Sequence, residues 1–338
     1  MVKQDNKDVL RRAQKKIFID FIQVVSMILI VLSHSFPNNM GGYSGLLNII
    51  PYLQEAGLAV FMCSSAYLTI YTNALEKYGY KRYLFKRFIR LLVPYFVMSI
   101  LMIIPKWLLS QYSSVEVTLN PLLILYQLIT PRNGILPHLW FVVTLFILSI
   151  ITPLLLWCCK KKIGCISILL GGLAILFIPN LTDVMCVNDI IDYYFWYSLG
   201  LIFALYEEKL LRINFLLIVG SGSLLVCIPL YFFDISTMYW TFYSIASVSL
   251  IIVVGVLFEQ RKKLSLDWIK KYTFSIYILS LPIQNVVEIL CVKLQLYIVL
   301  IIIIMFIVGL MLPVLIGCIV EFIEKKWKVK PLSKIIGM

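Results

Sequence analysis

Long runs of apolar residues, separated by short polar segments, dominate the sequence. A membrane hydrocarbon core about 30 Å thick is crossed by about 20 helical residues. Runs of about that length predict ten transmembrane helices, at about 17–36, 46–72, 88–109, 138–158, 163–180, 190–206, 212–233, 239–258, 272–292 and 296–322. The stretch Leu119–Ile129 is shorter, so it predicts an interfacial or re-entrant segment rather than a span.

The positions of the basic residues support this count. Cytoplasmic loops of membrane proteins are enriched in Lys and Arg. With the N-terminus in the cytoplasm, ten spans place all but three of the 30 basic residues on the cytoplasmic side. The three on the outer side are Lys106, Arg132 and Lys293. The pattern therefore predicts that both termini are cytoplasmic.

Composition agrees with a membrane protein and narrows the function classes. Hydrophobic residues make up 61% of the 338 residues, far more than in a soluble domain, and the mean hydropathy is +0.95. The net charge of +13 follows from the membrane topology and from attraction to anionic lipid, so it is no evidence for nucleic-acid binding. The eight cysteines lack the paired spacing of a metal site, and no metal is expected.

These observations predict an all-α integral membrane protein with one multipass domain over residues 1–338. A basic cytoplasmic segment, 1–16, precedes the first span, and a basic cytoplasmic tail, 324–338, follows the last. The partner expected on this ground is the lipid bilayer of the cell membrane. The sequence leaves a homo-oligomer open.

The first span carries polar side chains that are costly in hydrocarbon. Gln23 and His34 lie eleven residues apart, so they share a helix face and are about 16 Å apart along the axis. Asp20, Gln23, Met27, Val31 and His34 form one stripe on that face. The stripe is either a hydrogen-bonded seam between helices or part of a functional site, because ionisable groups within membranes usually mark one.

The chain has two histidines, and the predicted topology places both at the outer boundary. His34 ends the first span, and His138 begins the fourth, which runs inward. A neutral histidine can act as a general base near pH 7. At the cytoplasmic side, Lys86, Arg87 and Arg90 open the third span. They suit a ligand rich in phosphate, although topology alone accounts for positive charge there.

Several segments, taken in order, resemble the acyltransferase-3 family of multipass membrane acyltransferases. The segments are IDFIQVVSMILIVLSH (19–34), VFMCSSAYL (60–68), RFIRLLVPYF (87–96), HLWFVVTLFILSIITPLL (138–155), YYFWYSLGLIFA (193–204) and YTFSIYILSLPI (272–283). They cover nearly the whole chain in family order.

The resemblance implies an activity and a set of site residues. The family transfers an acyl group, most often acetyl from acetyl-CoA as co-substrate, to a hydroxyl of a cell-surface or lipid-linked glycan. It implies a bacterial plasma-membrane protein with an acyl-CoA site inside and a glycan site near the outer face. The implied catalytic residues are His34 and Asp20, the donor-binding residues are Arg87, Arg90, Gln23 and Ser65, and the acceptor-binding residues are His138, Trp140 and Phe141.

Three positions depart from the family pattern. Gln23 stands where the family has arginine, Ser280 where it has a late histidine, and Ala66 where it has glycine. Glutamine can hydrogen-bond a thioester carbonyl or an amide but supplies no charge. A transporter, flippase or non-catalytic membrane scaffold built on the same frame therefore remains the alternative function. The acceptor sugar, the acylated carbon and the existence of an acyl-enzyme stay open.

Overall fold

A computed structural model describes residues 16–37, 41–108, 119–261, 266–327 and 333. Every regular element in those ranges is a helix. The chain is therefore an all-α membrane protein, as the apolar runs predict. Residues 1–15 of the predicted basic N-terminal segment and most of the basic tail lie outside the described residues.

Each of the ten predicted spans is a helix in the structure. They are α2 (Ile17–Ser33), α3 (Ile50–Tyr71), α5 (Tyr80–Leu101), α8 (Trp140–Cys158), α9 (Lys162–Ile175), α10 (Val187–Leu205), α12 (Ile213–Phe232), α13 (Ser236–Arg261), α14 (Asp267–Lys293) and α15 (Ile298–Trp327). Shorter elements connect them, namely α4 (Ala74–Tyr78), α6 (Ile103–Leu108), α7 (Pro121–Ile129), α11 (Glu207–Leu210), η1 (Gly41–Ile49), η3 (Pro131–Asn133), η4 (Pro137–Leu139) and η5 (Val184–Cys186).

Seven helical segments of the described chain are long and apolar enough to cross a membrane. They contain α3, α5, α8, α12, α13, α14 and α15. Of the other three, α2 and α9 are shorter apolar helices with 17 and 14 residues, and α10, with 19 residues, is not among the seven. The count of ten spans and the cytoplasmic side of both termini therefore stay predictions. Helix α7, with nine residues, is too short to span, as expected for the stretch that contains it.

Helix α5 begins eight residues earlier than the apolar run suggests. It starts at Tyr80 rather than at residue 88, so the basic residues that follow lie on a helix and not in a loop. Gly79 separates α4 from α5 with a φ of 71°, a left-handed conformation that glycine adopts readily. Lys and Arg are good helix formers, which is why the charged segment continues the helix towards its polar end.

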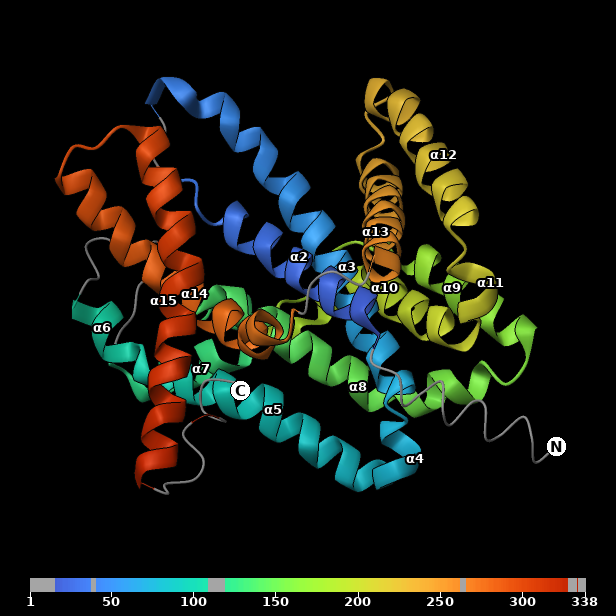
Figure 1. Cartoon of the computed structure of the whole chain (residues 1–338), viewed down its shortest axis with the longest axis horizontal. Helices are drawn as coiled ribbons and strands as arrows, with labels where there is room; N and C mark the ends of the chain where they lie inside the picture. Colours follow the sequence, from blue (N-terminus) through green and yellow to red (C-terminus); the bar gives the residue numbers. More distant parts are fainter. Residues whose placement is uncertain (1–15, 38–40, 109–118, 262–265, 328–332, 334–338) are drawn as a thin grey trace.

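Helix α2 lies at the centre of the bundle. It packs against α3, α13, α14 and α15. Figure 1 shows the α12–α13 pair on one side of α2 and α3, and the α14–α15 pair on the other. Helices α5 and α8 pack together, and α10 packs against α3, α8 and α9. The short predicted span at the N-terminus thus lies among four long helices.

Polar contacts connect α14 to α2 near both ends. At one end, Lys270 forms an ion pair with Asp20, whose side chain is buried. At the other end, Nε2 of the buried Gln284 donates to the carbonyl oxygen of Val31 at 3.0 Å and to Oγ of Ser35 at 2.9 Å. Partners inside the protein are needed at this depth because lipid offers none. These contacts fix the register of α14 against α2.

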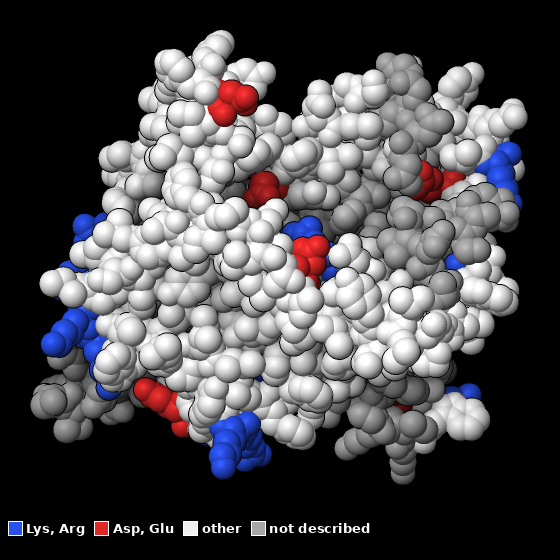
Figure 2. Space-filling view, turned by 180° about the vertical axis from the view of Figure 1, so that it is seen from behind, with Lys and Arg blue, Asp and Glu red and all other residues white. Residues whose placement is uncertain are grey.

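The outer surface of the bundle is largely uncharged. Figure 2 shows a face on which Lys, Arg, Asp and Glu gather at the edges and in a small central group, with a wide uncharged area between them. Large exposed apolar side chains are common on α12 and α15, including Phe232, Ile218, Leu315 and Phe322. Such a surface is suited to lipid contact.

The contact between α3 and α10 leaves no room for a side chain at Gly200. A Cβ atom there would lie 2.0 Å from the carbonyl oxygen of Cys63. We expect Gly200→Ala to destabilise the protein by about 1–3 kcal/mol, the usual cost of overpacking, and to lower its melting temperature in detergent. Gly222→Ala is the matched control, since nothing lies within 4 Å of that position. Equal melting temperatures for the two variants would contradict this packing.

Candidate active site

Two cavities border α2, one towards each end of the helix. The first, here called the basic cavity, has a volume of about 460 Å³. Its lining residues are Gln23, Phe61, Ser65, Leu68, Thr72, Ala74, Tyr78, Tyr83, Lys86, Arg87, Arg90, Leu91, Leu145, Asp267, Lys270, Lys271, Thr273 and Phe274. Five of these side chains are basic and one is acidic, so the cavity is suited to an anionic ligand.

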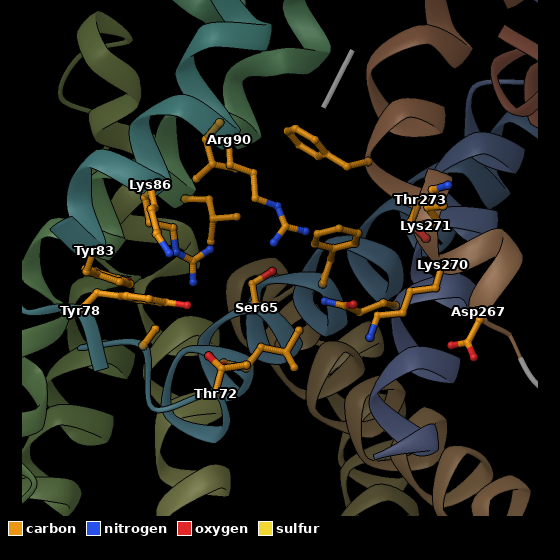
Figure 3. Close-up of a pocket in the computed structure, with 18 residues that line it drawn as sticks. Ser65, Thr72, Tyr78, Tyr83, Lys86, Arg90, Asp267, Lys270, Lys271 and Thr273 are labelled. Carbon is orange, nitrogen blue, oxygen red and sulfur yellow. The ribbon is translucent and has the colours of Figure 1, made fainter. Parts of the chain in front are cut away.

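The basic side chains reach the cavity from two helices. Figure 3 shows Arg90 extending from α5 towards the middle of the cavity, with Lys86 on one side and Lys270 on the other. Lys270 is paired with Asp20, and Lys271 is paired with Glu321. These ion pairs orient two lysines at the wall, while α5 supplies the guanidinium groups.

A short hydrogen-bond chain positions Arg87. Its Nη2 donates to Oγ1 of Thr69, and that hydroxyl donates to the carbonyl oxygen of Ser65 at 3.1 Å. The predicted donor-binding residues Arg87 and Ser65 are therefore connected through one turn of α3. At the mouth of the cavity, Nζ of Lys86 lies 3.3 Å from the ring centroid of Tyr78. Its hydrogen bond to the phenol lowers the pKa of Tyr78.

The second cavity, here called the histidine cavity, has a volume of about 290 Å³. Its lining residues are Ile30, His34, Gln54, Glu55, Leu58, Arg132, Pro137, His138, Trp140, Tyr193, Tyr277 and Leu281. Both histidines of the chain border this one space, although 104 positions separate them in the sequence. The fold therefore brings together the two groups that the sequence predicts only to lie on the same side.

An ion pair holds Arg132 at the edge of the histidine cavity. Nε of Arg132 donates to Oδ1 of the buried Asp189 at 2.7 Å, and the guanidinium lies 4.3 Å from the ring centroid of Trp140. Tyr193 packs on the same indole at 5.2 Å. Trp140 thus borders the cavity with a ring that is already held by protein neighbours.

Four aromatic rings separate the two cavities. Phe61 lines the basic cavity and packs edge-on against Phe141 at 5.3 Å. Phe141 packs against Tyr277, which lines the histidine cavity, at 5.6 Å. Tyr277 stacks on Phe274 of the basic cavity at 6.4 Å with an angle of 10° between the planes. This layer of Phe61, Phe141, Phe274 and Tyr277 is called the aromatic layer below.

The polar stripe of α2 has a packed middle and a cavity near each end. Gln23 borders the basic cavity and His34 borders the histidine cavity. Between them, Met27 and Val31 are buried in a cluster with Tyr272 and Ile276 of α14 and neighbouring side chains. The stripe is therefore no open channel in this structure, because α14 covers its central turns.

The remaining predicted site residues lie in or near these cavities. Asp20 is buried beside the basic cavity as the partner of Lys270, far along α2 from His34. Phe141 belongs to the aromatic layer and is buried. Their assigned roles in catalysis and acceptor binding stay predictions. Ser280, which replaces the family histidine, is also buried on α14.

Sequence reasoning gave no site role to several ionisable residues of the histidine cavity, among them Glu55 and Arg132. Glu55 lies inside the predicted span 46–72 and borders the cavity beside Gln54. An acid inside an apolar run is a signal that could have identified it, by the same logic as for Asp20. Among the described residues, no group of three His, Cys, Asp or Glu side chains is placed to hold a metal ion.

The fold and its cavities define the class first: an all-α membrane protein with a polar ligand site towards each end of its central helix. The chain belongs to the acyltransferase-3 family, whose model, described as an acyltransferase domain, matches residues 16–320. This match confirms the resemblance and makes the protein a membrane acyltransferase. Comparisons with curated proteins and with solved structures each gave no match.

The two cavities should be reachable from opposite sides of the membrane. Gln54 of α3 borders the histidine cavity, and Thr72, which caps the C-terminal end of α3, borders the basic cavity 18 residues further on, which corresponds to about 27 Å. We expect Thr72→Cys and Gln54→Cys to react with an impermeant maleimide from opposite sides of sealed vesicles.

The background for this experiment lacks Cys158 and Cys318, because the other six native cysteines are buried. The cysteine-depleted background without a new cysteine is the control for labelling of those six. Reaction of both variants from the same side only would contradict the arrangement.

Proposed function

We propose that the protein transfers an acetyl group from cytosolic acetyl-CoA to a hydroxyl of a cell-surface or lipid-linked glycan in a bacterial plasma membrane. One observation carries this proposal: a basic cavity and a histidine cavity lie towards opposite ends of the same helices. Helices α2, α3, α8 and α14 contribute to both. A donor and an acceptor that arrive from opposite sides can therefore meet inside one bundle.

The basic cavity suits the anionic part of a CoA thioester. Arg87 and Arg90 come from successive turns of α5, and a guanidinium group binds phosphate oxygens through paired donors. Lys270 and Lys271, each paired with a carboxylate, add further N–H donors on the α14 wall. Gln23, on the α2 wall, offers an amide to the neutral pantetheine or thioester groups.

The histidine cavity suits a hydroxyl acceptor. His34 and His138 provide imidazole nitrogens, and Glu55, Gln54 and Arg132 provide further polar groups for a sugar. In an acyl transfer, one imidazole accepts the hydroxyl proton while the acceptor oxygen attacks the thioester carbon. An imidazole could instead carry the acyl group between donor and acceptor.

The aromatic layer separates a donor in the basic cavity from the acyl transfer in the histidine cavity. The thioester reaches the histidine cavity only when Phe61, Phe274 or their neighbours move, since these rings close the basic cavity at that end. In the closed arrangement the layer keeps water on the acceptor side away from the donor. Donor binding is therefore expected to be coupled to a ring movement.

An assay with purified protein tests this function against the transporter alternative. The protein is reconstituted in proteoliposomes with isotope-labelled acetyl-CoA on one side and a panel of nitrophenyl hexopyranosides on the other. Formation of acetylated glycoside, detected by mass spectrometry, supports the proposal. Movement of acetyl-CoA or glycoside across the membrane without transfer of the acetyl group would favour the transporter.

A substitution at Arg90 tests whether this residue binds phosphate or serves only the membrane topology. We expect Arg90→Lys to weaken acetyl-CoA binding about 10- to 100-fold, because lysine keeps the charge but loses the planar pair of donors. Isothermal titration in detergent measures the affinity. Arg261→Lys, at the exposed end of α13, is the control and should bind like the wild type. If Arg90→Lys binds as tightly as the control, the charge serves topology alone.

Gln23 tests the departure from the family pattern. Gln23→Leu should leave neutral donor groups without hydrogen bonds, a loss of about 1–3 kcal/mol or about five- to hundredfold in donor affinity. Gln23→Arg should keep or raise activity if the new guanidinium shares Asp20, one turn away, with Lys270. Wild-type binding and transfer in both variants would show that this end of the stripe is structural.

A further inference from the structure

The ring of His138 is held in one tautomer by the backbone of α14. Its Nε2 lies 3.2 Å from the carbonyl oxygen of Ile278, and a carbonyl can only accept a hydrogen bond. Nε2 therefore carries the proton, and in the neutral ring Nδ1 is an unprotonated acceptor. One residue earlier on α14, the hydroxyl of Tyr277 donates to the carbonyl oxygen of His138.

The free acceptor on that ring has no partner in the part of the chain that the structure describes. His138 is only 7% exposed, and its buried Nδ1 makes no hydrogen bond there. Buried polar atoms of native proteins almost always have a partner. The ring borders the histidine cavity, so a ligand in that cavity is placed to supply the missing donor.

We propose that Nδ1 of His138 is the proton acceptor for the hydroxyl that becomes acylated. This inference rests on the proposed acyl transfer, and it changes the assignment drawn from sequence, in which His34 was the base and His138 positioned the acceptor. The arrangement around His138 is that of a prepared base, with a donor fixed on one nitrogen and a lone pair on the other.

The step balances without a further reactant. The acceptor O–H bond breaks and its proton passes to Nδ1, while the oxygen forms a C–O bond to the thioester carbon. The C–S bond then breaks and the sulfur leaves as a thiolate. The imidazolium of His138 returns the proton to that sulfur, so that the products are an ester and free CoA thiol.

Direct attack on the thioester needs no acyl carrier, so His34 lines the cavity beside the base. Several titratable or charged groups besides His34 surround His138, and each comes from a different element. They are Glu55 on α3, Arg132 on η3, Tyr193 on α10 and Tyr277 on α14, with Lys106 on α6 acting at longer range.

Nitrogen NMR tests the tautomer independently of activity. The chain has only two histidines, so selective ¹⁵N-histidine labelling of a protein purified without a histidine tag gives signals from two rings. His138→Gln and His34→Gln assign them by loss of signal. We expect His138 at neutral pH to show a protonated Nε2 and an unprotonated Nδ1. A protonated Nδ1 would overturn the proposal whether or not the protein is an acyltransferase.

Kinetics test the role of the base. With acetyl-CoA and the active nitrophenyl hexopyranoside, His138→Gln should lower kcat about 10²- to 10⁴-fold, the usual contribution of a general base. Glutamine keeps an amide donor for the Ile278 carbonyl, so the fold around the ring should survive, as melting temperature will show. The acidic limb of the kcat/KM profile, where the base becomes protonated, should vanish in His138→Gln and persist in residual turnover by His34→Gln.

The outcomes separate the two proposals. An acidic limb that persists in His138→Gln, or a rise in KM with unchanged kcat, would overturn the base assignment and restore a positioning role. Absence of acetyl transfer by the wild-type protein would overturn the proposed function, and the base assignment with it.

Discussion

The structure depends on the attachment of α14 to α2 near both ends. Lys270 pairs with the buried Asp20, and Gln284 donates to the backbone of Val31. Within lipid, a polar group on a central helix must find its partner on a neighbouring helix, since no water is present to replace it. The two contacts are 14 residues apart on α14, so they fix both the tilt and the register of this helix.

That register determines the chemistry of both cavities. The part of α14 between the two contacts supplies Phe274 to the basic cavity and Tyr277 to the histidine cavity. The carbonyl of Ile278, one residue further, holds the ring of His138. A shift of one residue along α14 would misplace Phe274 and Tyr277 of the aromatic layer. The same shift would move the carbonyl of Ile278 away from the ring of His138. Stability and site geometry therefore come from the same helix pair.

The separation of the cavities gives the proposed reaction its order. In that proposed reaction, the anionic CoA group would be held by Arg90 and its neighbours in the basic cavity, and the sugar hydroxyl would bind beside the two histidines. The aromatic layer closes the space between the two cavities. A thioester in the basic cavity would therefore react only after these rings move and connect the cavities. Exclusion of water until that moment protects the donor from hydrolysis, which is a common use of closure in transferases.

The sequence alone determined the fold class and several of the residues that line the cavities. Apolar runs gave the helices, since their length is imposed by the bilayer, and the motifs around Arg87, His34 and His138 indicated the family that the match confirms. Only the tertiary structure decided which side chains of different helices meet, because a periodic pattern along one chain does not encode it. It placed Glu55 in one cavity with both histidines, covered Met27 and Val31 with α14, and left Nδ1 of His138 without a described partner. These features arise from which helices pack together, and a helix's own pattern shows which face is buried but not what it meets.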